Sequence, residues 1–309
     1  MKTRRVARHV MGLAAASALL TGLAAGADER EGRKGDEIVV AGTRYHAGTP
    51  VVTWTDPGGY DAYRVPNPPA ATRHFGKRPI GITPDHGPDL ETLGAVVDQF
   101  VIHYDAAGTS RRCFRVLQEH GLSVHFLLDL DGTLYQTLDL KEAAWHATVA
   151  NGRSIGIEIA NIGAYAVDGR DPSPAWYSTD ADGRTRITIP GGPERGGLRD
   201  PSLHLVPARD GPVVGEVQGQ TLRQYDLTTQ QYAALIKLTA TLCTLFPRLT
   251  CDYPRGTTGR LTTTRLTDEA LKGYHGLLGH YHVQADKIDP GPAFQWDHVI
   301  HGARALLPR

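Results

Sequence analysis

Residues 99–104 read Gln-Phe-Val-Ile-His-Tyr, an apolar run that contains one histidine. A short apolar run of this kind predicts a buried strand. Alternate side chains of a strand point to opposite faces, so His103 lies on the face opposite to Phe100 and Ile102. A single histidine in such a strand is more often a hydrogen-bonded core residue than a metal ligand, unless other ligands lie nearby.

Residues 154–160, Ser-Ile-Gly-Ile-Glu-Ile-Ala, predict a second strand with the same alternation. The three isoleucines form one apolar face, and Glu158 points to the other face, between Gly156 and Ala160. A carboxylate with small neighbours is typical of a pocket wall. The solvent side of an edge strand gives the same pattern, and the sequence favours neither interpretation.

Further helices and strands are predicted on both sides of these two strands. Periodicity, caps and turn residues predict a helix around 90–97, a helix at 110–121, strands at 122–129 and 133–138 joined by a hairpin, a helix from 228 or 229 to about 246, and a closing helix at 296–307. A chain of 309 residues has room for one large domain or two small ones.

Two parts of the chain lie outside this pattern. Residues 28–88 contain short strands near 38–40 and 51–54 and a Pro-rich segment, so we expect an N-terminal extension that packs on a main domain of residues 89–309. Residues from about 162 to 220 lack periodicity and predict a long irregular insertion. Such an insertion either shapes a substrate groove or elaborates the surface.

The first 27 residues have the layout of a secretory signal peptide. Basic residues precede an apolar run from Val10 to Leu23, and Ala25-Gly26-Ala27 is a cleavage pattern; an uncleaved anchor is the alternative. Cleavage after Ala27 would remove four basic residues and leave 29 Lys and Arg against 33 Asp and Glu, a net charge of −4. We therefore expect an exported protein, periplasmic or extracellular, with no stable membrane insertion after cleavage and no nucleic-acid partner.

The three cysteines do not form a metal motif. The spacings of Cys113, Cys243 and Cys251 fit no Cys-based zinc site. In an exported protein Cys243 and Cys251 could form a disulfide across a helix end, which would leave Cys113 as a free, buried thiol.

Residues 279–296, GHYHVQADKIDPGPAFQW, concentrate two histidines, a lysine and an aspartate. Histidine and aspartate side chains are ligands for Zn²⁺. One stretch cannot close a metal site by itself. A catalytic zinc has three protein ligands and an open position for water, so His103 together with His280 and Asp289 would complete such a set.

Five motifs resemble, in the same order, those of the zinc-dependent N-acetylmuramoyl-L-alanine amidase family, which is related to the peptidoglycan recognition proteins. They are VIHYD, SVHFLLDLDGTLYQ, AAWHA, SIGIEIAN and GHYHVQADKIDPGPAFQWD, and they cover about residues 99–161 and 275–300. The resemblance implies an α/β fold, with a central mixed β-sheet flanked by helices, in a single amidase domain.

The resemblance also implies roles for individual residues. His103, His280 and Asp289 stand at the positions of the zinc ligands, for one Zn²⁺ per chain. Glu158 stands at the position of the catalytic acid and base, and Lys287 at that of a lysine that assists at the transition state. The bond cleaved would be the amide between the lactyl group of muramic acid and L-alanine. Many members place the zinc-binding histidine and aspartate ten residues apart, and here the spacing is nine.

Other residues near these motifs have less definite roles. His125, His146, Tyr104 and His282 are candidates for contacting substrate or for supporting the ligands. If the segment around His280 is extended, His282 shares its face, so the second histidine ligand could be either one. The expected partner is peptidoglycan or a muropeptide. A non-catalytic peptidoglycan-binding module on the same fold, or a zinc hydrolase of another amide, are the alternatives.

Overall fold

The structure is a computed structural model that describes residues 35–64, 74–80 and 87–308. The predicted signal peptide, residues 1–27, lies outside the described residues, as does much of the Pro-rich segment. Lys34–Arg309 form one compact unit, and the fold is that of its described residues. Within its described residues, no helix has both the length and the apolar character needed to cross a membrane.

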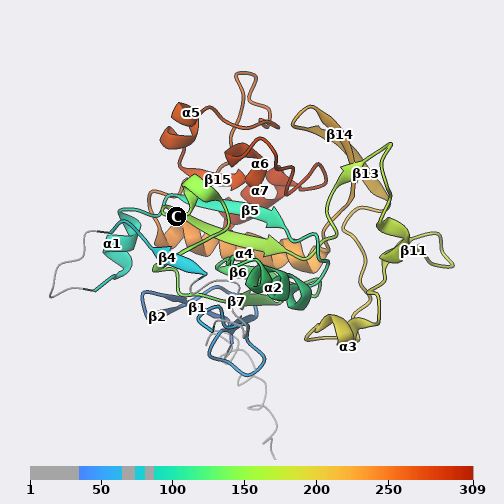
Figure 1. Cartoon of the computed structure of the whole chain (residues 1–309), viewed down its shortest axis with the longest axis horizontal. Helices are drawn as coiled ribbons and strands as arrows, with labels where there is room; N and C mark the ends of the chain where they lie inside the picture. Colours follow the sequence, from blue (N-terminus) through green and yellow to red (C-terminus); the bar gives the residue numbers. More distant parts are fainter. Residues whose placement is uncertain (1–34, 65–73, 81–86, 309) are drawn as a thin grey trace, which may run out of the picture. The chain divides into compact units, whose positions relative to one another are not determined.

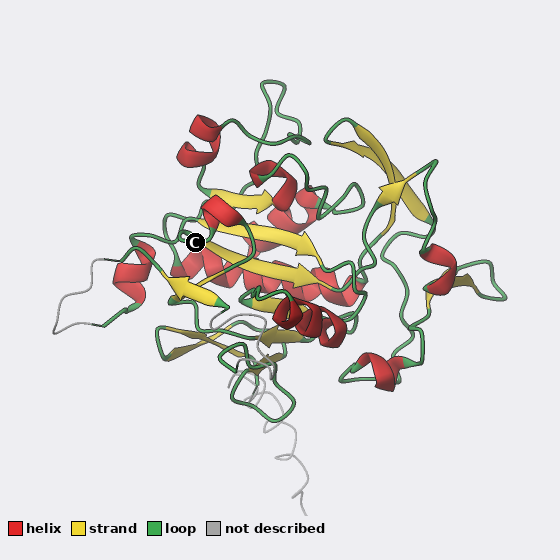
Figure 2. Ribbon diagram, in the orientation of Figure 1, coloured by secondary structure: helices red, strands yellow, loops and turns green. Residues whose placement is uncertain are grey.

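A six-stranded sheet forms the centre of the domain (Figures 1 and 2). In spatial order its strands are β15 (Gly276–Gly279), β5 (Gln99–Tyr104), β9 (Ser154–Ile159), β6 (Phe126–Leu128), β7 (Leu134–Gln136) and β3 (Val51–Thr53). Neighbouring strands are parallel except β6 and β7, which form the predicted hairpin. The expected central mixed sheet is confirmed.

Helices cover both faces of this sheet, as the expected α/β fold requires. The described residues contain the helices α1 (Leu90–Gly94), α2 (Ser110–Glu119), α3 (Pro193–Gly196), α4 (Thr229–Leu245), α5 (Asp268–Gly273), α6 (His280–Val283) and α7 (Trp296–Leu306), and the 3₁₀ turns η1 (Thr148–Ala150) and η2 (Ser173–Ala175). On one face, α4 and α7 pack on the main apolar core. On the other face, α2 packs over β6 and β7.

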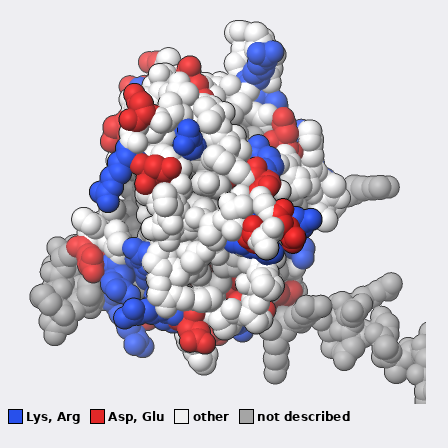
Figure 3. All heavy atoms as spheres, turned by 90° about the vertical axis from the view of Figure 1, so that its right-hand side faces the viewer, with Lys and Arg blue, Asp and Glu red and all other residues white. Residues whose placement is uncertain are grey.

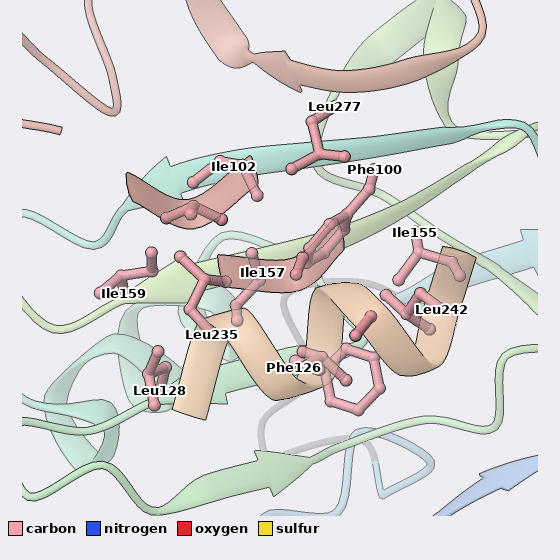
Figure 4. Close-up of a cluster of buried hydrophobic side chains, with 14 of the residues drawn as sticks. Phe100, Ile102, Phe126, Leu128, Ile155, Ile157, Ile159, Leu235, Leu242 and Leu277 are labelled. Atoms are coloured by element: carbon pink, nitrogen blue, oxygen red, sulfur yellow. The ribbon is translucent and has the colours of Figure 1, made fainter. Parts of the chain in front are cut away.

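The main core lies between α4 and the sheet. Figure 4 shows Phe100 and Ile102 of β5 and the isoleucines of β9 facing Leu235 and Leu242 of α4, which confirms the predicted alternation. Burying these aliphatic and aromatic side chains supplies the main driving force for folding. On the opposite face, His103 and Glu158 are paired neighbours on the parallel strands β5 and β9.

The predicted N-terminal extension is built into the domain. Strand β1 (Glu37–Val40) pairs with β2 (Thr43–His46), and β3 is the edge strand of the central sheet. Ile38, Val40 and Val51 are buried in the main core. A segment expected to pack on the domain therefore supplies part of its sheet and core. Further along, β4 (Phe75–Lys77) pairs with β8 (Glu142–Ala144).

The predicted irregular insertion contains regular structure. Its strands are β10 (Tyr165–Ala166), β11 (Tyr177–Thr179), β12 (Thr185–Ile187), β13 (Pro212–Val217) and, at its end, β14 (Gln220–Tyr225). Strands β10, β14 and β13 form a sheet, and Trp176 and Ile189 belong to a small separate core. Figure 3 shows acidic and basic side chains interspersed with uncharged surface on this side of the domain.

The three cysteines are free in this structure, and the expected disulfide stays a prediction. Cys113 is buried, as expected. The thiols of Cys243, near the end of α4, and Cys251, in the loop that follows, influence each other's pKa.

Candidate metal site

Three predicted ligands from separate parts of the chain meet on the sheet face opposite α4. His103 comes from β5, His280 is the first residue of α6, and Asp289 lies in the loop that follows. His103 Nδ1 lies 2.8 Å from Asp289 Oδ2 and 3.1 Å from His280 Nδ1. His280 Nδ1 lies 3.1 Å from the same carboxylate oxygen. All three side chains are buried, and this set could hold a metal ion.

Hydrogen bonds on the far side of each imidazole suit metal binding. His280 Nε2 lies 2.8 Å from the side-chain oxygen of Gln284, so it carries the proton and leaves a lone pair on Nδ1. His103 Nε2 lies 3.0 Å from His146 Nδ1, and His146 Nε2 lies 3.2 Å from Ser154 Oγ. When His103 Nε2 donates to His146 Nδ1, and His146 Nε2 donates to Ser154 Oγ, His103 Nδ1 also keeps a lone pair. Such outer partners fix the orientation and tautomer of metal-binding histidines.

The charge states of His103 and Asp289 also fit a divalent cation. Burial, and then the neighbouring His280, lower the pKa of His103 to about 4, so its imidazole is neutral at pH 7. Burial by itself would raise the pKa of Asp289. The close contacts with His103 and His280 hold that pKa below its usual range, so the carboxylate is ionised. Neutral imidazoles and an ionised carboxylate are the forms that bind metal ions.

Glu158 lies beside this group, on the strand next to His103. Its Oε2 atom is buried and has no hydrogen-bond partner among the described residues. Burial, and then the charges of Asp289 and Asp105, raise the pKa of Glu158 well above its usual value, although Lys287 opposes this. A buried carboxyl group of this kind can take up and return a proton.

Lys287 stands at the edge of the site. Its Nζ lies 3.7 Å from Asp286 Oδ2, and its side chain is 39% exposed. Its positive charge lowers the pKa values of His103 and Glu158, so it acts on the site electrostatically. The predicted positions of Glu158 and Lys287 are thus close to the three candidate ligands.

His282 does not join the candidate ligands, because the segment that contains it is not extended. Residues 280–283 form α6, in which successive side chains turn by about 100°, so His280 and His282 point to nearly opposite sides. His282 Nδ1 accepts from Gly279 N–H at 2.8 Å, and His282 Nε2 donates to Thr262 O at 2.6 Å. Burial lowers the pKa of His282 to about 3. The expectation that the two histidines share a face is wrong.

His146 fills the space that the sequence indicated beside Glu158. A Cβ atom at position 156 would lie 2.6 Å from the His146 ring, so only glycine there leaves room for it. Burial, and then His103, lower the pKa of His146 well below its usual value. His146 therefore helps to orient the His103 ring through the contact with His103 Nε2.

His125 and Tyr104 lie near the site without joining the candidate ligands. His125 is fully buried and accepts from Gly156 N–H at 3.1 Å, so it braces β9. The Tyr104 ring packs against Gly163, where a Cβ would lie 2.5 Å away.

The sequence did not predict a role for Gln284, which hydrogen-bonds to His280, or for Ser154, which hydrogen-bonds to His146. Gln284 lies four positions after His280, a spacing that places side chains together on a helix. That signal was present but depended on recognising a helix of only four residues. Ser154 carried no signal, because serine at the start of a strand is common in many contexts.

A comparison with protein families covers the part of the chain that contains His103 and Glu158. Residues 93–187 match the N-acetylmuramoyl-L-alanine amidase family, Amidase_2. This segment contains His103, His146 and Glu158 and ends before His280 and Asp289. No curated protein matches the chain.

Several solved structures are similar to the chain. A selenomethionine derivative of AmpD shares 18% identity, with 76% of this chain and 90% of that chain covered and a TM-score of 0.34. The amidase AmiD from E. coli, in complex with the substrate anhydro-N-acetylmuramic acid-L-Ala-D-gamma-Glu-L-Lys, shares 17% identity, covering 72% and 60%, with a TM-score of 0.38. Drosophila peptidoglycan recognition protein SA shares 14% identity, covering 81% and 90%, with a TM-score of 0.35. Over residues 93–187, the chain is similar to the N-acetylmuramoyl-L-alanine amidase family.

Proposed function

We propose that this protein is a secreted, zinc-dependent N-acetylmuramoyl-L-alanine amidase. Its substrate would be peptidoglycan or a muropeptide, cleaved between the lactyl group of muramic acid and L-alanine. The observation that carries the proposal is the meeting of His103, His280 and Asp289 beside the unpartnered carboxyl oxygen of Glu158. The family match over residues 93–187 supports the same chemistry.

The chain's own residues would share the catalytic work. His103, His280 and Asp289 would hold the zinc ion, which would supply Lewis-acid activation of water. Glu158 Oε2 is free to accept a proton from the attacking water and to return it to the leaving amine of L-alanine. Lys287 places a positive charge near the carbonyl oxygen, where negative charge develops.

One face of the domain can be compared with the surface of nucleic-acid-binding proteins. On the side of the domain in Figure 3, basic and acidic side chains are mixed, whereas nucleic-acid-binding proteins carry a continuous basic face.

Cleavage of a defined muropeptide tests the activity. N-acetylmuramoyl-tripeptide is incubated with the protein, and free tripeptide is measured by mass spectrometry. We expect release that stops with a chelator, returns with added zinc, and falls by about 10³-fold or more in Glu158→Gln. Glu158→Gln should still bind zinc. Binding of the muropeptide without any release of tripeptide would instead indicate a recognition module.

Export forms part of the proposal and has its own test. The exported chain is expected to begin at Asp28, as determined by N-terminal sequencing after expression with its own leader. A full-length chain retained in the membrane fraction would support the anchor alternative instead.

A further inference from the structure

The β13–β14 hairpin of the insertion reaches the segments that carry two of the candidate metal ligands. Its two-residue turn consists of Gln218 and Gly219, with φ angles of 53° and 72°. Glycine adopts this left-handed conformation readily, whereas a residue with a side chain does so at an energetic cost. Gln218 adopts this conformation while its side chain contacts the segment that begins with His280.

Gln218 binds the end of the helix that begins with His280. Its Nε2 donates to Tyr281 O at 2.9 Å and to Gln284 O at 3.1 Å. Its Oε1 accepts from Arg265 N–H at 3.1 Å. The last carbonyls of a helix have no partner within the helix, so Gln218 supplies donors that α6 lacks. It thereby holds the backbone of Gln284, whose side chain binds the outer nitrogen of His280.

Gln224, on β14, binds the turn that follows Asp289. This side chain is 1% exposed. Its Nε2 donates to Pro290 O at 3.0 Å, and its Oε1 accepts from Ala293 N–H at 3.0 Å. A Cβ at position 291 would lie 2.1 Å from Gln224 Oε1, so Gly291 is required for this close approach.

The three candidate ligands differ in how they are anchored. His103 lies within a central strand that is paired on both sides. His280 begins a helix of four residues, and Asp289 lies in a loop. We propose that Gln218 and Gln224 are positioning residues that hold His280 and Asp289 at metal-binding separation, so that the insertion completes the metal site. This inference depends on the proposed function only in that the site must bind a metal ion.

Metal affinity tests the proposal directly. Zinc affinity is measured by competition with a chromophoric chelator, and ligand geometry is followed in the visible absorption spectrum of the Co²⁺-loaded protein. We expect Gln218→Ala and Gln224→Ala each to weaken zinc binding by about 10- to 100-fold and to alter the Co²⁺ spectrum. Gln220→Ala is the matched control, because Gln220 is an exposed glutamine on the same hairpin.

Isosteric variants separate positioning from folding. Gln218→Glu and Gln224→Glu keep the side-chain length and the accepting oxygen but cannot donate to the carbonyl groups when ionised. They should lower zinc affinity in the same way while circular dichroism stays that of the wild type. Zinc affinity and Co²⁺ spectra equal to those of Gln220→Ala in all four variants would overturn the proposal. A wild type that binds zinc but releases no peptide would contradict the amidase activity and leave this inference intact.

Discussion

Gly156 shows how much the site depends on single residues. It leaves the space that the His146 ring occupies, and His146 in turn binds the outer nitrogen of His103. Alternation along the strand predicted the face of Glu158 and the open space beside it. It could not predict that a histidine from another segment would fill that space, because contacts between distant segments leave no local pattern.

A methyl group at position 156 should therefore act on the candidate metal site. Gly156→Ala would bring a carbon atom to 2.6 Å from the His146 ring and force that ring to move. We expect a loss of about 1–3 kcal/mol in the free energy of unfolding and about 10-fold weaker zinc binding. Urea unfolding and chelator competition measure the two effects.

Gly273 provides the control for this substitution. A Cβ there would meet no atom within 4 Å, so Gly273→Ala should leave both quantities nearly unchanged. Equal effects of the two substitutions would argue against a special role for Gly156.

Asp129, at the end of β6, should make stability depend on pH. Burial, and then the charge of Asp131, raise the pKa of Asp129 to about 7. The usual value in an unfolded chain is about 3.9. Since the folded state holds this proton more tightly, the stabilisation is fully present below about pH 4 and is lost as the pH rises through 7.

Replacing Asp129 with asparagine removes this titration. Between pH 4 and pH 8 the wild type should lose up to about 4 kcal/mol of unfolding free energy relative to Asp129→Asn. Urea unfolding of both proteins across this range measures the difference. Curves that stay parallel would show that Asp129 has an ordinary pKa.

At the scale of secondary structure, long or buried elements could be predicted and short ones could not. β5, β9 and α4 have enough residues for their periodicity to show. The four-residue α6 has too few, and an extended reading of it left the second histidine ligand open between His280 and His282. The β13–β14 hairpin turns at Gln218-Gly219, where asparagine or aspartate before glycine would be the stronger signal. Consequently the sequence did not predict a role for Gln218 or Gln224.

The start of α4 offers a test at this scale. Thr228 Oγ1 accepts from Gln231 N–H at 3.0 Å and donates to Leu130 O at 2.8 Å, and Thr228 is fully buried. Thr228→Ala removes both bonds and should lower the free energy of unfolding by about 1–2 kcal/mol. Thr229→Ala, at the exposed neighbouring position, should have a much smaller effect. Thermal or urea unfolding distinguishes the two, and equal losses would contradict the capping role.

At the scale of the whole molecule, the fold joins distant segments into one site. His103 is fixed by the central sheet, and His280 and Asp289 follow 177 and 186 residues later. The segment 280–293 is held by side chains of the insertion, so a part of the chain outside the recognisable motifs contributes to the candidate metal site. Residue types and family motifs indicated the candidate ligands, whereas the support from the insertion required the structure.

Zinc stoichiometry tests the central claim most directly. Purified protein is loaded with zinc, dialysed and analysed for metal by mass spectrometry. We predict one zinc ion per chain in the wild type and in Glu158→Gln, and almost none in His103→Ala, His280→Ala or Asp289→Ala. Full zinc retention in these three variants, or no zinc in the wild type, would contradict the account.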